Sequence, residues 1–234
     1  MELRVRDVAK LFAVAEKKIY NWIEEKKLPA SEINGQYRFN RSELLEWATA
    51  HQIPLSGKIF AEPANGGTPL SGLADALEAG GIHHNVGGTD SESVLQAIVN
   101  TMPLPDDADR EMLLDVLLAR EALGSTGVGD GIAIPHVRSP VVVHVPRAMI
   151  SLCFLTNPID FDAIDGKPVN AMFSFISPTI RVHLHLLSRL AFGLQDIGFK
   201  AAVLRQASAE EILQEARRVE GGLTQPAAAT THGK

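Results

Sequence analysis

Residues 124–136 read GSTGVGDGIAIPH, and this stretch is the most informative part of the chain. Four glycines and two hydroxyl side chains precede a short apolar run that ends at Pro135 and His136. Glycines adopt backbone conformations closed to other residues and bring amide groups close to a ligand, as anion-binding loops require. Pro135 restricts its own backbone and that of Ile134, which fixes how His136 is presented. A histidine beside an anion-binding loop indicates phosphoryl chemistry.

Two familiar nucleotide-binding patterns are absent from this loop. No Gly-Lys-Ser/Thr follows at the spacing of a P-loop, and residues 127–129 lack the third glycine of a dinucleotide fingerprint. We therefore expect no nucleotide or other organic cofactor, and nothing in the sequence indicates Mg²⁺. The loop residues expected to face the anion are Ser125, Thr126, Gly127 and Gly129.

A helix is expected over residues 109–123, where apolar residues recur at helical spacing. They are Met112, Leu113, Val116 and Leu117. Arg120 continues their stripe and reaches the end of the helix where the glycine loop begins. An isolated arginine there would equally well cover the core with its stem while its head reaches water. The adjacent loop favours an anion-binding role, because arginine matches a phosphoryl group through two parallel hydrogen bonds.

A second helix is expected over residues 179–194, and only one of its two histidines shares the apolar face. That face is marked by Leu186, Leu187, Leu190 and Leu194. His183 aligns with it, whereas His185 aligns with the polar side at Ser188 and Arg189. His183 is therefore the candidate for the site. The alternative is a core histidine that is satisfied by a backbone carbonyl.

Metal binding and a sulfur nucleophile are both poorly supported. The pairs His83-His84 and His183-Leu184-His185 lack accompanying cysteines or carboxylates, and a two-residue spacing on a helix points rings to different sides. We expect no metal site. Cys153 lies in an apolar run that predicts a buried strand, where a thiol is inert.

Three segments resemble the phosphotransferase-system enzyme IIA family of the fructose, mannitol and nitrogen-regulatory type. They are residues 120–138, REALGSTGVGDGIAIPHVR, residues 158–169, PIDFDAIDGKPV, and residues 183–191, HLHLLSRLA. The resemblance covers roughly residues 69–222 and implies a mixed β-sheet sandwiched by helices. It also implies that His136 accepts a phosphoryl group from an HPr-like phosphocarrier protein, with Arg120 and His183 stabilising that group. Val137 departs from the glycine or alanine of many relatives.

The first fifty residues predict a second, smaller domain. Apolar stripes indicate two short helices, Asn34-Gly35 indicates a hairpin, and a third helix begins at Ser42. Five pieces of this segment resemble the winged helix-turn-helix DNA-binding modules of the excisionase and mercury-resistance-regulator type. They are residues 7–9 (DVA), 19–23 (IYNWI), 28–30 (LPA), 35–39 (GQYRF) and 45–47 (LEW). The residues expected to contact DNA are Lys17, Lys18, Tyr20 and Asn21 on the second helix, with Arg38 and Arg41 beside the wing. The alternative is an ordinary solvated helix face, because glutamates interrupt the basic surface.

Charge supports DNA binding only mildly. Residues 1–58 hold ten Lys and Arg against eight Asp and Glu, whereas the rest holds twelve against twenty, for a net charge of −6. This balance argues against indiscriminate nucleic-acid binding by the whole chain. We expect specific DNA binding to need two copies of the module. No long heptad region supplies a dimer interface, so a homodimer would form through another surface.

The chain is long enough for two modest domains joined by a linker. Prolines and glycines mark that linker at residues 51–68, which would allow the domains to move independently. Downstream, a helix begins at a capping box of Thr89 and Glu92, and strand-like runs at 141–145, 149–156 and 169–176 alternate with helices, as in α/β proteins. A small, polar tail over residues 223–234 predicts disorder.

A lone cysteine excludes an internal disulfide, and we find neither a signal-peptide pattern nor an apolar run that would span a bilayer. We therefore expect a cytoplasmic protein. Three functions remain open. The first is a phosphotransfer regulator that acts through DNA, and the second is a non-catalytic transcription factor whose larger domain binds a partner. The third is a transport component that passes its phosphoryl group to a separate enzyme IIB.

Overall fold

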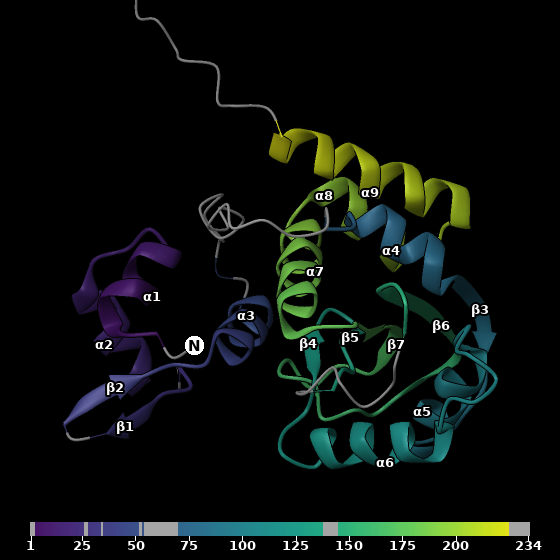
Figure 1. Cartoon of the computed structure of the whole chain (residues 1–234), viewed down its shortest axis with the longest axis horizontal. Coiled ribbons are helices and arrows are strands. Elements are labelled where there is room, and N and C mark those ends of the chain that lie inside the picture. The colour runs from purple at the N-terminus through teal and green to yellow at the C-terminus, as the bar shows by residue number, and fades with distance from the viewer. Residues whose placement is uncertain are drawn as a thin grey trace, which may run out of the picture.

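The computed structural model describes residues 3–25, 28–33, 35–51, 53, 70–137 and 145–224. These residues form a small N-terminal domain and a larger α/β domain, which are two lobes of the molecule (Figure 1). This architecture agrees with the fold class that the sequence predicts. The predicted linker at 51–68 and the predicted strand at 141–145 lie almost entirely outside the described residues.

The larger domain is built on a five-stranded mixed sheet in the order β3-β6-β7-β5-β4. The strands are β3 (Ile82–Val86), β4 (Gly127–Gly129), β5 (Ile132–Ala133), β6 (Met149–Ile159) and β7 (Val169–Ile176). β6 pairs with β7 antiparallel and with β3 parallel. β5 runs parallel to β7 and antiparallel to β4. The two long apolar strands therefore form the centre of the sheet, and the glycine-rich segment forms one edge.

Helices cover both faces of this sheet (Figure 1). One face carries α4 (Leu73–Gly80), α7 (Ile180–Gly193), α8 (Ile197–Leu204) and α9 (Ala209–Thr224), and the other carries α5 (Ser91–Thr101) and α6 (Arg110–Glu121). Successive side chains of a strand point to opposite faces, so a sheet buried on both sides needs strands that are apolar throughout. In β6, Leu152 and Phe154 enter the core on the first face, whereas Met149 and Cys153 enter the core on the second.

Burial decides the chemistry of the single cysteine. Cys153 is fully buried in β6, and this burial raises the pKa of its thiol to about 11. The thiol is therefore protonated at neutral pH and unreactive, as the sequence predicts.

The N-terminal domain is a helix-turn-helix with a two-stranded wing. Its elements are α1 (Val5–Leu11), α2 (Glu16–Glu25), β1 (Ser31–Ile33), β2 (Gln36–Arg38) and α3 (Arg41–Ala50). Three aromatic rings form its centre, with centroids 5.7 Å apart for Phe12 and Trp22 and 5.3 Å apart for Trp22 and Trp47. Leu3 pairs with Phe39 and ties the start of the chain to the end of the wing.

α3 belongs to both domains. It packs within its own domain and also lies against α7 and β4 of the larger domain (Figure 1). Leu44, Leu45, Trp47 and Ala48 are all buried, and a helix that is buried on several sides is typically enclosed by other elements. The Gln195 side chain also donates to the Ile53 carbonyl at 3.0 Å. In the structure, α3 therefore docks one domain on the other.

Local details differ from three expectations. α5 is capped by Asp90, whose carboxylate accepts from the Ser93 amide, and not by Thr89. Met112 is half exposed, so the buried stripe of α6 runs through Leu113, Leu117 and Arg120. α9 continues to Thr224, past the expected start of the tail. No helix in the described part of the chain is both long and apolar enough to cross a bilayer.

Replacing Gly80 by alanine should destabilise the larger domain. A Cβ at Gly80 would lie 2.4 Å from the backbone of Ile150, so α4 would have to move away from β6. We expect a loss of about 1–3 kcal/mol in the free energy of unfolding by urea, as for overpacked cores. The control is Gly87→Ala, because a Cβ there meets nothing within 4 Å. Equal urea midpoints for the two variants would contradict this close approach.

Candidate active site

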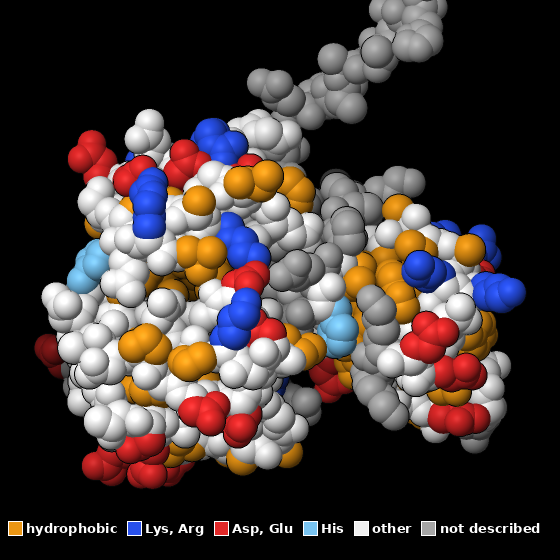
Figure 2. All heavy atoms as spheres, turned by 180° about the vertical axis from the view of Figure 1, so that it is seen from behind, with side chains coloured by type: hydrophobic (Ala, Val, Ile, Leu, Met, Phe, Trp, Pro, Cys, Tyr) orange, Lys and Arg blue, Asp and Glu red, His pale blue; other side chains and the backbone are white. Residues whose placement is uncertain are grey.

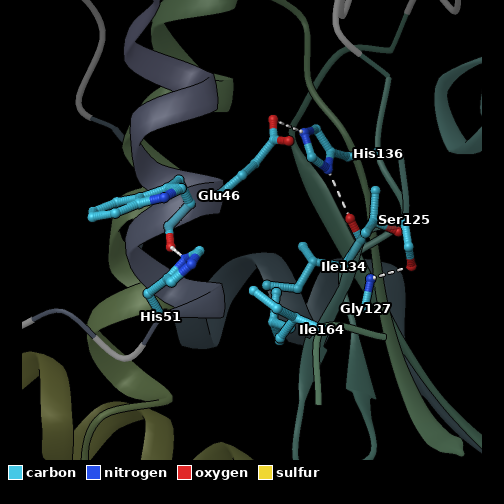
Figure 3. Close-up of a pocket in the computed structure, with 10 residues that line it drawn as sticks. Glu46, His51, Ser125, Gly127, Ile134, His136 and Ile164 are labelled. Atoms are coloured by element: carbon cyan, nitrogen blue, oxygen red, sulfur yellow. Dashed lines mark hydrogen bonds and ion pairs between the residues drawn. The ribbon is translucent and has the colours of Figure 1, made fainter. Parts of the chain in front are cut away.

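His136 follows β5 and is fixed by its neighbours in the chain and in the sheet. It forms an isolated bridge with Phe175, and its ring stacks on the Phe175 ring with centroids 5.8 Å apart. Its Nδ1 lies 2.7 Å from the Ile134 carbonyl oxygen, which can only accept a hydrogen bond. Nδ1 therefore carries a proton, and Nε2 points toward the side chain of Glu46 (Figure 3). His136 is only 1% exposed, and it lines a cavity that Glu46 also lines.

His183 lies beside His136, as the helical pattern predicts. Thr179 caps α7, and His183 in its first turn places its ring centroid 5.2 Å from that of His136. Burial, with a smaller effect of the nearby His136, lowers the pKa of His183 to about 3, so its ring is neutral at pH 7. Neither ring nitrogen has a hydrogen-bond partner among the described residues, although both are buried. A buried polar group without a partner is costly and points to a ligand that would supply one.

Arg120 completes the predicted group of three. It lies in the last turn of α6, is 8% exposed, and donates from Nη1 to the Gly124 carbonyl at 2.8 Å. Its Nη2 faces the same space as His136 Nε2, because both groups contact one carboxylate. The structure therefore brings Arg120, His136 and His183 together.

That carboxylate is Glu46, from α3 of the N-terminal domain. Its Oε1 lies 2.9 Å from His136 Nε2, and its Oε2 forms an ion pair with Arg120 Nη2 (Figure 3). Burial opposes ionisation of Glu46, but the hydrogen bond with His136 and the charges of His136 and Arg120 outweigh it and lower the pKa to about 2. The carboxylate is therefore ionised at neutral pH.

Sequence reasoning missed Glu46 as a site residue. It is separated from His136 by 90 positions and lies in the third helix of the module that resembles DNA-binding domains. The one local signal is a carboxylate between Leu45 and Trp47 in a helix whose other central residues are buried. An acidic residue in such a position needs a partner, which the sequence does not identify.

The glycine-rich segment forms a tight hairpin of β4 and β5, and not the open anion loop that the sequence suggests. The Thr126 amide donates to Glu121 Oε1 at 2.9 Å, and the Gly127 amide donates to Ser125 Oγ at 2.9 Å. These amides already have partners because a hydroxyl and a carboxylate lie within reach. Glycine is needed at position 127, where a Cβ would lie 2.7 Å from the backbone of Ala163.

The site opens on a cavity of about 200 Å³ between the two domains (Figure 3). Its walls are Glu46, Trp47 and His51 from the N-terminal side, and Ser125, Thr126, Gly127, Val128, Ile134, His136 and Ile164 from the larger domain. Gly129 lies instead on a smaller neighbouring cavity. Three of the four predicted loop residues therefore border the space in front of His136, and the amides of Thr126 and Gly127 already have partners. Val137 is buried in the core and does not line this cavity.

The predicted DNA-contacting residues lie away from this site. Lys17, Lys18, Tyr20 and Asn21 are exposed on α2. The Tyr20 ring lies 6.0 Å from Tyr37 of the wing, and Arg38 is held by Gln36 Oε1 at 2.8 Å. Arg41, at the start of α3, is half-buried. Figure 2 shows Lys and Arg side chains at the outer end of this lobe, with acidic side chains on the same face.

His185 and the pair His83-His84 make ordinary contacts. His185 Nε2 accepts from Arg189 Nε at 2.9 Å, which places it on the polar side of α7 as predicted. His83 Nε2 lies 3.2 Å from the Gly80 carbonyl, and the His84 ring packs on Phe154. The described residues contain no group of three or more His, Cys, Asp and Glu arranged to hold a metal ion.

Comparison with known families matches both domains. Residues 76–217 match the family described as "Phosphoenolpyruvate-dependent sugar phosphotransferase system, EIIA 2". Residues 2–52 match a family described as a helix-turn-helix domain.

Individual relatives agree with the first match. The nitrogen regulatory protein of Pseudomonas aeruginosa is 35% identical over 142 residues, which are 59% of this chain and 90% of that protein. The fructose-specific EIIA component of Haloferax volcanii is 34% identical over 106 residues, 44% of this chain and 67% of that protein. The crystal structure of nitrogen regulatory protein IIA-Ntr from Neisseria meningitidis has a TM-score of 0.51 and 29% identity, and covers 58% of this chain and 92% of its own.

Replacing Glu46 by glutamine should remove a stabilisation that depends on pH. The pKa of Glu46 falls from an ordinary value of 4.5 to about 2 on folding, because the ionised form faces His136 and Arg120. Its contribution is therefore complete above pH 4.5 and is lost as the pH falls through about 2. Urea unfolding at pH 7 should place the variant about 1–3 kcal/mol below the wild type. This difference should narrow steadily below pH 4.5, and a gap of equal size at pH 3 and pH 7 would contradict the assignment.

Proposed function

This chain belongs to the enzyme IIA type 2 family of the sugar phosphotransferase system, and we propose that His136 accepts a phosphoryl group from an HPr-like phosphocarrier protein. The observation that carries the proposal is the arrangement around His136. Its Nδ1 donates to the Ile134 carbonyl, and its Nε2 faces an anion, the Glu46 carboxylate, which also pairs with Arg120, while the His183 ring lies alongside. A phosphoryl acceptor needs a fixed ring with one free nitrogen and donors for the phosphoryl oxygens.

The transfer is an in-line displacement between two histidines. The lone pair of His136 Nε2 attacks phosphorus while the N–P bond of the carrier's phosphohistidine breaks, and that electron pair returns to the carrier's nitrogen. Throughout the transfer, the proton stays on His136 Nδ1 and remains hydrogen-bonded to the Ile134 carbonyl. Charge spreads over the three equatorial oxygens in such a transition state, so the protein acts mainly by position and charge. Arg120 supplies a fixed cation, and neutral His183 supplies an N–H donor.

The finer proposal is a phosphorylation-dependent regulator that acts on transcription. It is supported by the helix-turn-helix match and by the names of the nitrogen regulatory relatives. Four candidate DNA contacts on α2 are exposed. Such a regulator would act in the cytoplasm, where DNA and the carrier meet.

A second candidate is a transport component that passes its phosphoryl group to a separate enzyme IIB. The similarity to a fructose-specific EIIA component favours it. Transfer of label from the phosphorylated chain to an isolated enzyme IIB would distinguish it from the regulator. A chain that binds DNA without ever accepting a phosphoryl group would instead be a transcription factor with a partner-binding domain.

Phosphoryl transfer to the purified chain should depend on His136. Incubation with radiolabelled phosphoenolpyruvate, enzyme I and the phosphocarrier should give acid-labile label on the wild type and none on His136→Ala. For His183→Ala we expect a rate lower by roughly 100- to 1,000-fold, the scale for loss of one donor to a transition state. Phosphorus–nitrogen NMR should assign the bond to Nε2, because Nδ1 is occupied.

The control for these variants is His185→Ala, on the same helix but facing Arg189. It should be labelled at the wild-type rate. No label on the wild type while the carrier itself is charged would contradict the phosphotransfer function.

DNA binding should depend on the exposed lysines of α2. Lys17→Ala and Lys18→Ala should each weaken binding to duplexes selected from a random library, and each should reduce the slope of log affinity against log salt by about one. Lys10→Ala removes an exposed lysine from α1 instead and is the matched control. Equal salt slopes for all three variants would contradict the assignment of α2 to DNA.

A further inference from the structure

We propose that the Glu46 carboxylate occupies the place of the phosphoryl group, so that docking of the helix-turn-helix domain and phosphorylation of His136 exclude one another. The inference rests on the proposed function, because it takes His136 as the phosphoryl acceptor. It adds an internal ligand for that site, supplied by the chain's own N-terminal domain.

The contacts of Glu46 are those of an anion bound in the site. One carboxylate oxygen lies 2.9 Å from His136 Nε2, and the other pairs with Arg120 Nη2. These are the reacting nitrogen and the guanidinium expected to hold phosphoryl oxygens. Arginine binds carboxylates and phosphates through the same hydrogen-bond geometry, so one anion can replace the other.

His183 shows that the carboxylate fills this place incompletely. A carboxylate has two oxygens, and both are used by His136 and Arg120. His183 is 1% exposed, and both its ring nitrogens lack a partner among the described residues. A phosphoryl group has three oxygens, so it would offer an acceptor to the His183 ring as well as to Arg120. The site therefore suits a larger anion better than the one it holds.

Docking also holds His136 in a form that cannot react. Its Nδ1 faces the Ile134 carbonyl and its Nε2 faces the Glu46 carboxylate, and both partners only accept hydrogen bonds. Both contacts are satisfied only by the imidazolium ion, which has no lone pair on Nε2 with which to attack phosphorus. Glu46 must leave, and the Nε2 proton must pass to solvent, before transfer begins.

Phosphorylation would in turn prevent docking. A phosphoryl group on Nε2 carries close to two negative charges at pH 7 and would fill the space of the carboxylate. Glu46 would then meet a like charge and would lose both of its partners. The apolar contacts of α3 remain, but the ion pair that orders its docked face would be replaced by repulsion.

The first test compares Glu46→Gln and Glu46→Ala with the wild type in the transfer from the charged phosphocarrier. Because only the undocked fraction of the protein accepts phosphate, removal of the carboxylate should raise the second-order rate by roughly tenfold or more. The control is Glu43→Gln, which removes the same charge from α3 at a residue that does not line the cavity. It should react at the wild-type rate.

The second test measures domain separation by small-angle X-ray scattering. Phosphorylation should increase the radius of gyration of the wild type toward that of unphosphorylated Glu46→Ala, and should change Glu46→Ala little further. A purely structural role for Glu46 would not give this dependence on phosphorylation.

The outcomes separate the two proposals. Equal labelling rates for wild type and both Glu46 variants, or a phosphorylated wild type that stays compact, would overturn the exclusion while leaving the acceptor function intact. No label on any variant, with the carrier charged, would overturn the acceptor function and the exclusion with it. Label on the Glu46 variants alone would support both.

Discussion

The Glu46 carboxylate links the two domains by a buried polar contact, an ion pair with Arg120 that is extended by the hydrogen bond to His136. A carboxylate and a guanidinium lose most of their hydration when they are buried, and each is tolerable only because the other is present. Here the two charges come from different domains. Either domain alone would leave its own charge without this partner. A phosphoryl group that reaches Arg120 would compete with Glu46 for this contact, because arginine binds both anions with the same geometry.

α3 gives this contact its geometry. The helix is held on one side by the aromatic centre of the N-terminal domain, where the ring of Trp47 lies 5.3 Å from that of Trp22. On its other side it packs against α7 and β4, the elements that carry His183 and the glycine-rich hairpin. One continuous apolar core connects the N-terminal domain to one face of the sheet. The packing of α3 therefore positions the carboxylate next to His136, and the ion pair and hydrogen bond form at that position.

The sequence predicts those features of the site that depend on the periodicity of a single helix. Helical spacing places Arg120 and His183 on buried faces. Both lie at the site because α6 ends just before β4 and α7 begins just after β7, at the same end of the sheet. The role of Glu46 could not be predicted in this way, because its partner His136 is 90 positions away and no periodicity links the two residues. The shape of the glycine-rich segment could not be predicted for another reason. Its glycines are compatible with an open anion loop and with a tight hairpin. In the hairpin that forms, Glu121 and Ser125 accept from two of its amides.

The unpaired His183 ring explains why an internal carboxylate is a suitable regulator and a poor permanent ligand. If Glu46 satisfied every donor in the site, a phosphoryl group would gain nothing by replacing it. Because the carboxylate engages two groups and leaves the third buried without a partner, the site keeps part of its binding free energy for the phosphoryl group. Coupling between two ligands of one site is reciprocal. The free energy by which docking disfavours phosphorylation equals the free energy by which phosphorylation disfavours docking. A single carboxylate is therefore enough to couple the phosphorylation of His136 to the position of the helix-turn-helix domain.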